Sequence, residues 1–278
     1  MKKILTVIII NCFFWLSGQN KDFIVFNALL YKNTPELESY GYHDIFLFYE
    51  DELLDKNFKK SSNGNLINYS KIKAAALKAS NEPNIPVCLD IESWKLDDHH
   101  RVASKSKYIK VLKYFKKYNS KSKVGYFGVF PMDSPHADYS FKSPIRESVI
   151  MPKWHESNNF VKNIGRESLI YFPVFYTRMK DVETWEKIVL EKVSKIKEVN
   201  KTAKIYGFIW PQYYTDDGLY KFIEPDVWKR QLQTIYKNCD GVVIWSHYLG
   251  NNGKPIEFSY EMEWFKITNQ FIKDKGIK

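Results

Sequence analysis

Short apolar runs alternate regularly with longer amphipathic stretches along this chain, and the pattern leaves few possible folds. The runs are almost continuously apolar, which is typical of strands buried on both faces of a parallel sheet. Strands of a half-solvated antiparallel sheet would alternate apolar and polar residues instead. Seven runs are predicted to be strands: 23–29, 45–49, 86–91, 124–130, 169–176, 205–210 and 241–245.

The stretches between the runs are predicted to be helices, because their apolar residues recur at helical spacing. The clearest stripe lies between residues 181 and 199, with lysines and glutamates on the opposite face. Similar stripes occur at 108–115, 227–235 and 262–271. The apolar residues of the first stripe are Trp185, Ile188, Val189, Val193 and Ile196.

Alternating strands and helices predict an α/β fold, either an open doubly wound sheet or a closed barrel. No glycine-rich phosphate loop follows any run, which removes the main argument for a nucleotide-binding open sheet. We therefore predict a distorted TIM-like barrel with about seven parallel strands and outer helices. Because no repeat or low-complexity linker divides the chain, residues 20–278 are expected to form one barrel domain.

The N-terminus has the pattern of a secretory signal peptide. Lys2 and Lys3 precede an apolar run over residues 4–16, and the small residues Ser17 and Gly18 follow it. The run is shorter than the ~20 residues that a membrane-spanning helix needs. We predict that residues 1–19 are removed, that the protein is secreted or periplasmic, and that no segment spans a membrane.

The net charge is +10, from 42 basic and 32 acidic residues, and the excess is spread along the chain. Such a field favours an anionic partner, although a basic protein without one is equally consistent with it. No nucleic-acid-binding motif is present, so an acidic polysaccharide is preferred to a nucleic acid. We expect a monomer without a cofactor.

Two cysteines, Cys88 and Cys239, remain after the predicted signal peptide, too few for a disulfide framework. Both adjoin apolar runs. They are predicted to be buried thiols that pack as small apolar side chains, and a bridge between them is the alternative.

The third run ends in two carboxylates, Asp90 and Glu92. Side chains two positions apart on a strand point the same way, so both are predicted to face the top of the barrel, where active sites of such barrels lie. Two carboxylates this close do not both ionise freely, so one is expected to retain its proton near neutral pH. Helix capping and a lysine partner are the alternative roles for an isolated pair.

Polar and aromatic residues also end the other runs, and together they are predicted to form a platform for sugar rings. His99 and His100 follow two aspartates, but adjacent residues do not turn toward one ion easily, and no metal-binding spacing is present, so no metal site is predicted. The candidate substrate-binding residues are Tyr126, Tyr176, Arg178, Trp210, Trp245 and Ser246.

These residues resemble the animal hyaluronidases of venom and sperm, which hydrolyse hexosaminide bonds on a distorted seven-stranded barrel. The resemblance covers nearly all of the chain after the signal peptide. The stretch between Trp94 and Gly125 is shorter than in that family, which implies a missing helix and a reduced groove wall, and the family's disulfide cysteines are absent. The segments that carry the resemblance are 46–50, 63–66, 90–94, 125–128, 173–178 and 240–246.

The resemblance implies a secreted glycoside hydrolase acting on an N-acetylhexosamine polymer such as hyaluronan or chondroitin. Glu92 corresponds to the proton donor, and Asp90 to the residue that orients the substrate acetamide for substrate-assisted, retaining hydrolysis. The resemblance also makes Tyr176 a candidate catalytic residue, because it corresponds to a tyrosine that contacts the acetamide. Trp245 corresponds to the wall of the pocket. The alternatives are a noncatalytic carbohydrate-binding barrel and a glycosidase acting on another N-acetylhexosamine polymer, such as chitin or peptidoglycan.

Overall fold

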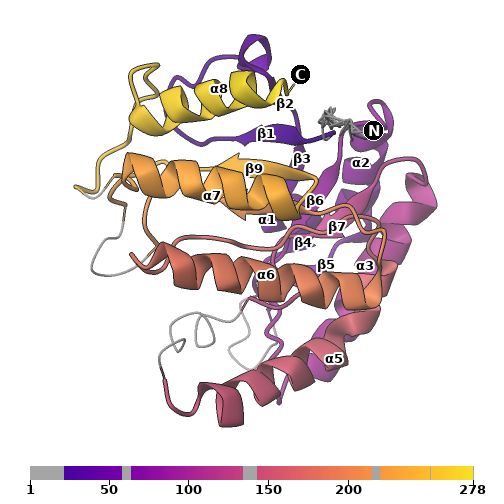
Figure 1. The fold of residues 1–278 in the computed structure, drawn as a ribbon. Helices are drawn as coiled ribbons and strands as arrows, with labels where there is room; N and C mark the ends of the chain where they lie inside the picture. Colours follow the sequence, from indigo (N-terminus) through magenta and orange to yellow (C-terminus); the bar gives the residue numbers. More distant parts are fainter. Residues whose placement is uncertain (1–21, 58–63, 134–142, 215–219, 251, 278) are drawn as a thin grey trace, which may run out of the picture.

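The computed structural model describes residues 22–57, 64–133, 143–214, 220–250 and 252–277, and the predicted signal peptide lies outside them. Strands and helices alternate along the described chain (Figure 1). The strands are β1 (Ile24–Ala28), β2 (Tyr42–His43), β3 (Phe46–Tyr49), β4 (Leu54–Asp55), β5 (Leu66–Ile67), β6 (Val87–Asp90), β7 (Val124–Tyr126), β8 (Tyr206–Ile209) and β9 (Gly241–Trp245). The helical elements are η1 (Glu38–Tyr40), α1 (Glu50–Leu53), α2 (Tyr69–Ser80), α3 (Arg101–Tyr118), η2 (Arg146–Ile150), α5 (Met151–Glu167), α6 (Val182–Val199), α7 (Pro225–Asn238) and α8 (Glu263–Lys275).

The strands build a distorted barrel of mainly parallel pairs. One sheet has the order β2-β1-β9-β8 and another the order β3-β6-β7, while β4 and β5 form a separate antiparallel pair. Isolated parallel bridges from Phe127 to Phe172 and from Val174 to Phe208 connect the two larger sheets. On the other side, β2 leads into β3 after two residues, so the chain passes directly between the sheets. The predicted fold class, a distorted TIM-like α/β barrel, is confirmed.

The predicted strand 169–176 is the irregular part of the barrel, because it pairs only through isolated bridges. Pro173 lies near its centre and has no N–H group for a ladder hydrogen bond. The carbonyl of Pro173 still accepts a hydrogen bond from Phe208 N (2.9 Å), and Phe175 N donates to Phe208 O (2.8 Å). The predicted position of this segment was therefore right, and its predicted regularity was wrong.

Helices surround the strands. Figure 1 shows α5, α6, α7 and α8 side by side along one outer face, each in contact with the next. The stretch between Trp94 and Gly125, which the resemblance implied had lost a helix, still contains α3. Within the described residues, no helix is both long and apolar enough to cross a membrane.

Helix α6 confirms the clearest predicted stripe. The side chain of Asp181 caps its N-terminus by accepting a hydrogen bond from Thr184 N (3.3 Å). Trp185 and Ile196 are buried against the barrel as expected. The predicted polar face was wrong in one respect, because Lys192 and Lys195 are also buried.

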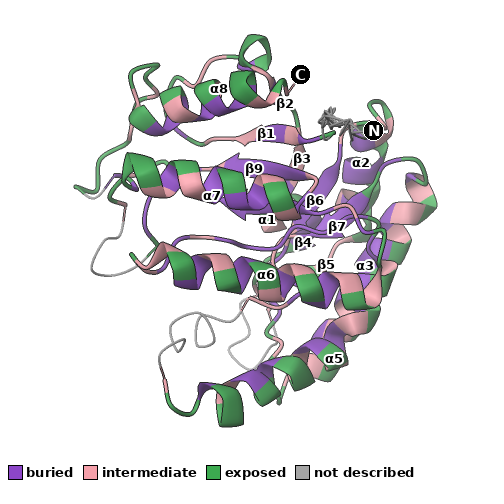
Figure 2. Cartoon of the chain, in the orientation of Figure 1, coloured by how far each residue is buried: buried purple, intermediate pink, exposed green. Residues whose placement is uncertain are grey.

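Side chains along the strands alternate between the barrel interior and the layer packed against the helices, as the two-residue period requires. Leu89 and Val242 lie in the outer layer, and Figure 2 shows buried and exposed residues on different faces of the helices. Cys88 lies inside the barrel and Cys239 in the outer layer; both are buried, as predicted. The interior cluster consists of Phe26, Cys88, Ile170, Phe172, Tyr206, Phe208 and Val243.

Gly125 in β7 allows a close backbone approach. A Cβ atom there would lie 2.1 Å from the carbonyl oxygen of Ile170, so neither backbone can stay in place if a side chain is added. We expect Gly125→Ala to lower the free energy of unfolding by about 1–3 kcal/mol, measured by urea denaturation. The control is Gly250→Ala, whose Cβ would approach only side-chain atoms of Ile256 and Asn252, at 3.3 Å or more. Equal stability of the two variants would contradict the close approach.

Candidate active site

The candidate site lies at the carboxyl ends of the barrel strands, where the inward-facing positions continue beyond the interior cluster. Tyr49 at the end of β3 pairs in register with Asp90 at the end of β6. Asp90 follows the interior residue Cys88 by two positions, and Glu92 follows by two more, so both carboxylates border the same cleft of about 350 Å³. The prediction that they face one side is confirmed.

Two further hollows adjoin this cleft. One of about 510 Å³ also borders Tyr49, Asp90 and Glu92, and one of about 250 Å³ borders Glu92, Phe127 and Asp133. Among the residues described, Glu92 borders all three hollows and its side chain is exposed, whereas Asp90 is more deeply placed. The arrangement can accommodate an extended ligand that passes over Glu92.

The two carboxyl groups have perturbed acidities. Burial, together with the negative charges of Glu92 and Glu50, raises the pKa of Asp90 to about 7. Burial and the charges of Glu50 and Asp133 raise the pKa of Glu92. Oδ1 of Asp90 is buried and has no hydrogen-bond partner among the described residues. Near neutral pH Asp90 is therefore partly protonated, as the sequence predicts for one member of the pair.

Glu50, the first residue of α1, is a third carboxylate at this position, and the sequence analysis did not identify it. Its Oε2 accepts hydrogen bonds from the backbone N–H groups of Glu92 (3.1 Å) and Ser93 (2.9 Å). The available signal was the position of Glu50 directly after a strand end, since the carboxyl ends of parallel strands meet at one rim.

Aromatic rings form one wall of the cleft. Tyr176 stacks on Trp245 with ring centroids 5.6 Å apart and an interplanar angle of 24°. Trp210 meets Trp245 edge-on at 5.2 Å. Nε1 of Trp245 donates a hydrogen bond to the hydroxyl of Tyr49 (3.2 Å), which fixes the indole ring. The structure thus brings together Tyr176, Trp210 and Trp245 from the predicted set.

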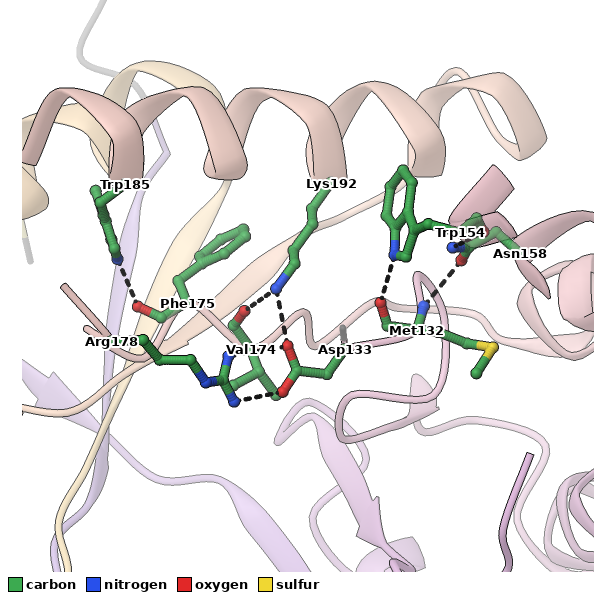
Figure 3. A network of polar contacts seen from close by, with 9 residues as sticks. All are labelled: Met132, Asp133, Trp154, Asn158, Val174, Phe175, Arg178, Trp185 and Lys192. Carbon is green, nitrogen blue, oxygen red and sulfur yellow. Dashed lines mark hydrogen bonds and ion pairs between the residues drawn. The ribbon is translucent and has the colours of Figure 1, made fainter. Parts of the chain in front are cut away.

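Arg178 borders the cleft, but a buried ion-pair network holds its guanidinium (Figure 3). Its Nη2 and Nη1 donate to the two carboxylate oxygens of Asp133 at 2.6 and 3.2 Å. Lys192 donates to the same carboxylate (2.9 Å) and to Val174 O (3.0 Å). These two cations lower the pKa of Asp133. Arg178 is thus tied to Asp133 and shapes the cleft wall.

Two predicted substrate-binding residues lie outside the cleft. Tyr126 is buried against α3, and its hydroxyl donates a hydrogen bond to Tyr108 O (2.8 Å). Its register partner Leu89 also faces outward, so the next residue, Phe127, faces the cleft instead. Ser246 is fully buried, and its Oγ accepts a hydrogen bond from Leu30 N (2.7 Å).

The histidines after the third strand belong to a turn. Asp97 accepts hydrogen bonds from the backbone N–H groups of His99 (3.1 Å) and His100 (3.0 Å), and it also contacts His100 Nδ1 (2.7 Å). In the parts of the chain that the structure covers, no group of three or more His, Cys, Asp or Glu side chains is arranged to hold a metal ion.

Fold and site together define an α/β barrel with an acidic cleft, walled by aromatic rings, at the carboxyl ends of its strands. No protein-family model and no curated protein sequence matches the chain. Bee venom hyaluronidase is a similar solved structure, with a TM-score of 0.59 and 13% identity over 90% of this chain and 96% of that chain. Its complex with a hyaluronic acid tetramer is similar at a TM-score of 0.59 and 14% identity, over 90% and 95% of the two chains. At this level of identity the likeness shows a shared fold.

Proposed function

We propose that this protein is a glycoside hydrolase that cleaves N-acetylhexosaminide bonds in a polysaccharide. The observation that carries the proposal is the position of Glu92, an exposed carboxyl group with a raised pKa at the junction of three hollows, next to the protonatable Asp90. A general acid has to reach the glycosidic oxygen and to hold a proton at the working pH. The position of Glu92 between the hollows and the upward shift of its pKa both support this role, and the aromatic wall offers apolar faces for sugar rings.

The proposed reaction is substrate-assisted and retains the anomeric configuration. Glu92 gives its proton to the glycosidic oxygen while the carbonyl oxygen of the substrate's acetamide attacks the anomeric carbon, so that the leaving sugar departs and an oxazolinium ion forms. Glu92, now a base, takes a proton from water, which attacks the anomeric carbon and reopens the ring. The buried Oδ1 of Asp90 is available to accept the acetamide N–H, and Tyr176 borders the same cleft as a further acetamide contact.

We further propose that the protein is secreted and that its substrate is an anionic polymer such as hyaluronan or chondroitin. Secretion is supported by the pattern of residues 1–19. The substrate class is supported by the net charge of +10 and by the resemblance of the sequence motifs to the animal hyaluronidases. The solved complex of bee venom hyaluronidase with a hyaluronic acid tetramer makes that polymer the first to test. Other N-acetylhexosamine polymers remain the alternative substrates.

A reducing-end assay of the mature protein on hyaluronan, chondroitin, chitin oligomers and peptidoglycan tests the proposal. We expect cleavage of one of them, and a loss of roughly a hundredfold or more in Glu92→Gln, which keeps the side-chain shape but cannot donate the proton. The matched control is Glu82→Gln, an exposed position that borders none of the three hollows around Glu92. Binding of a polymer by both proteins without cleavage by either would favour the noncatalytic binding barrel instead.

A further inference from the structure

Glu50 lies beside the two proposed catalytic carboxyl groups without being one of them. It follows Tyr49, the register partner of Asp90, and borders the same 510 Å³ hollow as Asp90 and Glu92. Glu50 lies in α1, whereas Asp90 ends β6 and Glu92 follows that strand. Glu50 and Glu92 are 42 positions apart in the sequence. Its contacts therefore connect two separate parts of the rim.

Three N–H groups donate to the Glu50 carboxylate. Oε2 accepts from the backbone N–H groups of Glu92 (3.1 Å) and Ser93 (2.9 Å), and Oε1 accepts from Nδ2 of Asn65. Asn65 is itself held, because its N–H donates to Ser93 Oγ (3.0 Å) and its carbonyl accepts from Trp94 Nε1 (2.7 Å). The turn that carries Glu92 is thus fixed to Glu50 through the backbone of Glu92 itself.

Glu50 also adds negative charge where it acts on both carboxyl groups. Its charge contributes to the raised pKa of Asp90 and is the largest charge effect on Glu92. The positive charges nearby have other partners: Lys71 contacts Asp55, and Arg178 and Lys192 contact Asp133. Other titratable or charged groups also surround the pair. They are Cys88, Tyr49, Tyr108, Asp133, Tyr176, at the border of the larger hollow Asp51 and Lys56, and at the border of the cleft Tyr214, Tyr220 and His247.

We propose that Glu50 is a positioning residue for the reaction: its carboxylate holds the backbone N–H groups at Glu92 and Ser93 and places a fixed negative charge beside the Asp90–Glu92 pair. The catalytic meaning of this role rests on the proposed function, whereas the charge effect on Asp90 does not. We assign Glu50 no proton transfer, because the N–H groups that its carboxylate binds are backbone and amide groups of the protein.

The test compares Glu50→Gln, Glu50→Asp and the control Glu52→Gln, an exposed neighbour on the same short helix. Glu50→Gln removes the negative charge, so the basic limb of the pH profile of kcat/KM is expected to move to lower pH by about one unit. Glu50→Asp keeps the charge but is too short to reach all three donors. This variant is expected to leave the basic limb of the pH profile unchanged. It is expected to lower kcat about tenfold, because a small displacement of a catalytic group slows the reaction.

A titration of Asp90 does not depend on enzymatic activity, so it distinguishes failure of this proposal from failure of the proposed function. The ¹³C carboxyl resonance of Asp90, assigned by its loss in Asp90→Asn, is expected to titrate about one unit lower in Glu50→Gln than in the parent. An unmoved titration, or a fall in activity with an unmoved basic limb, would overturn the charge role. If Glu50→Gln does not fold, a kcat for Glu50→Asp equal to that of the parent would overturn the positioning role.

Discussion

Asp133→Ala is expected to lower the free energy of unfolding by about 3–5 kcal/mol. Asp133 is the shared anion for two buried cations, Arg178 and Lys192, whose side chains are only 5% and 3% exposed. Removing the carboxylate takes away the anion that both buried cations contact, and losing one partner of a buried ion pair costs much more than losing an exposed one. Figure 3 shows that the same network adjoins the backbone of Val174 at the barrel wall.

Urea denaturation at pH 7 measures this effect, and Glu257→Ala is its matched control. Glu257 pairs with Lys32 at 2.8 Å, but both side chains are more than 60% exposed, so its removal is expected to change the stability far less than Asp133→Ala does. A second variant, Asp133→Ala with Lys192→Met, also removes one of the two buried cations and is expected to regain part of the lost stability. A loss for Asp133→Ala as small as that of the control would mean that water reaches the two cations.

Sequence periodicity predicts the fold and the acidic pair, because both depend on local patterns. Continuous apolar runs identified six regular strands, and the two-residue period placed Asp90 and Glu92 on one side. The same period explains the failures at Tyr126 and Ser246. A strand position shifted by one residue faces the opposite layer, so Phe127 and Trp245 border the cleft while their neighbours are buried behind it.

The missed features depend on contacts between distant parts of the chain. Arg178 follows Asp133 by 45 positions, and Glu50 precedes Ser93 by 43, so neither local spacing nor residue type predicts these contacts. Lys192 was expected at the surface because lysine usually is, yet its long side chain reaches the Asp133 carboxylate from α6. These contacts form only in the folded barrel, where the ends of the strands lie close together.

Asp90→Asn is expected to be more stable than the parent protein at pH 8, by up to about 4 kcal/mol. The pKa of Asp90 is raised from 3.8 to about 7 in the folded protein. Between these two values the folded state holds a proton that the unfolded chain releases, so the stability of the parent falls as the pH rises through this window and then levels off. Asparagine has no charge to bury, and the penalty disappears.

Urea denaturation of both proteins at pH 4, 6 and 8 measures the sign and the size of the difference in their free energies of unfolding. The stability difference is expected to be small at pH 4, where Asp90 is protonated in the folded parent, and to reach its full value above pH 7. Asp44→Asn, at an exposed position, controls for the effect of the substitution itself. A difference that stays constant with pH, or an Asp90→Asn variant less stable than the parent at pH 8, would contradict a protonated Asp90.

The same variant connects stability with the proposed reaction. If Asp90 orients the acetamide as a carboxyl group, Asp90→Asn loses activity while it gains stability, because the burial and the like charges that raise its pKa are a cost of the folded state. A role confined to packing predicts instead that activity falls only as far as the fold is weakened, whatever the change in stability. Measuring the two quantities on one preparation therefore separates a functional carboxyl group from a structural one.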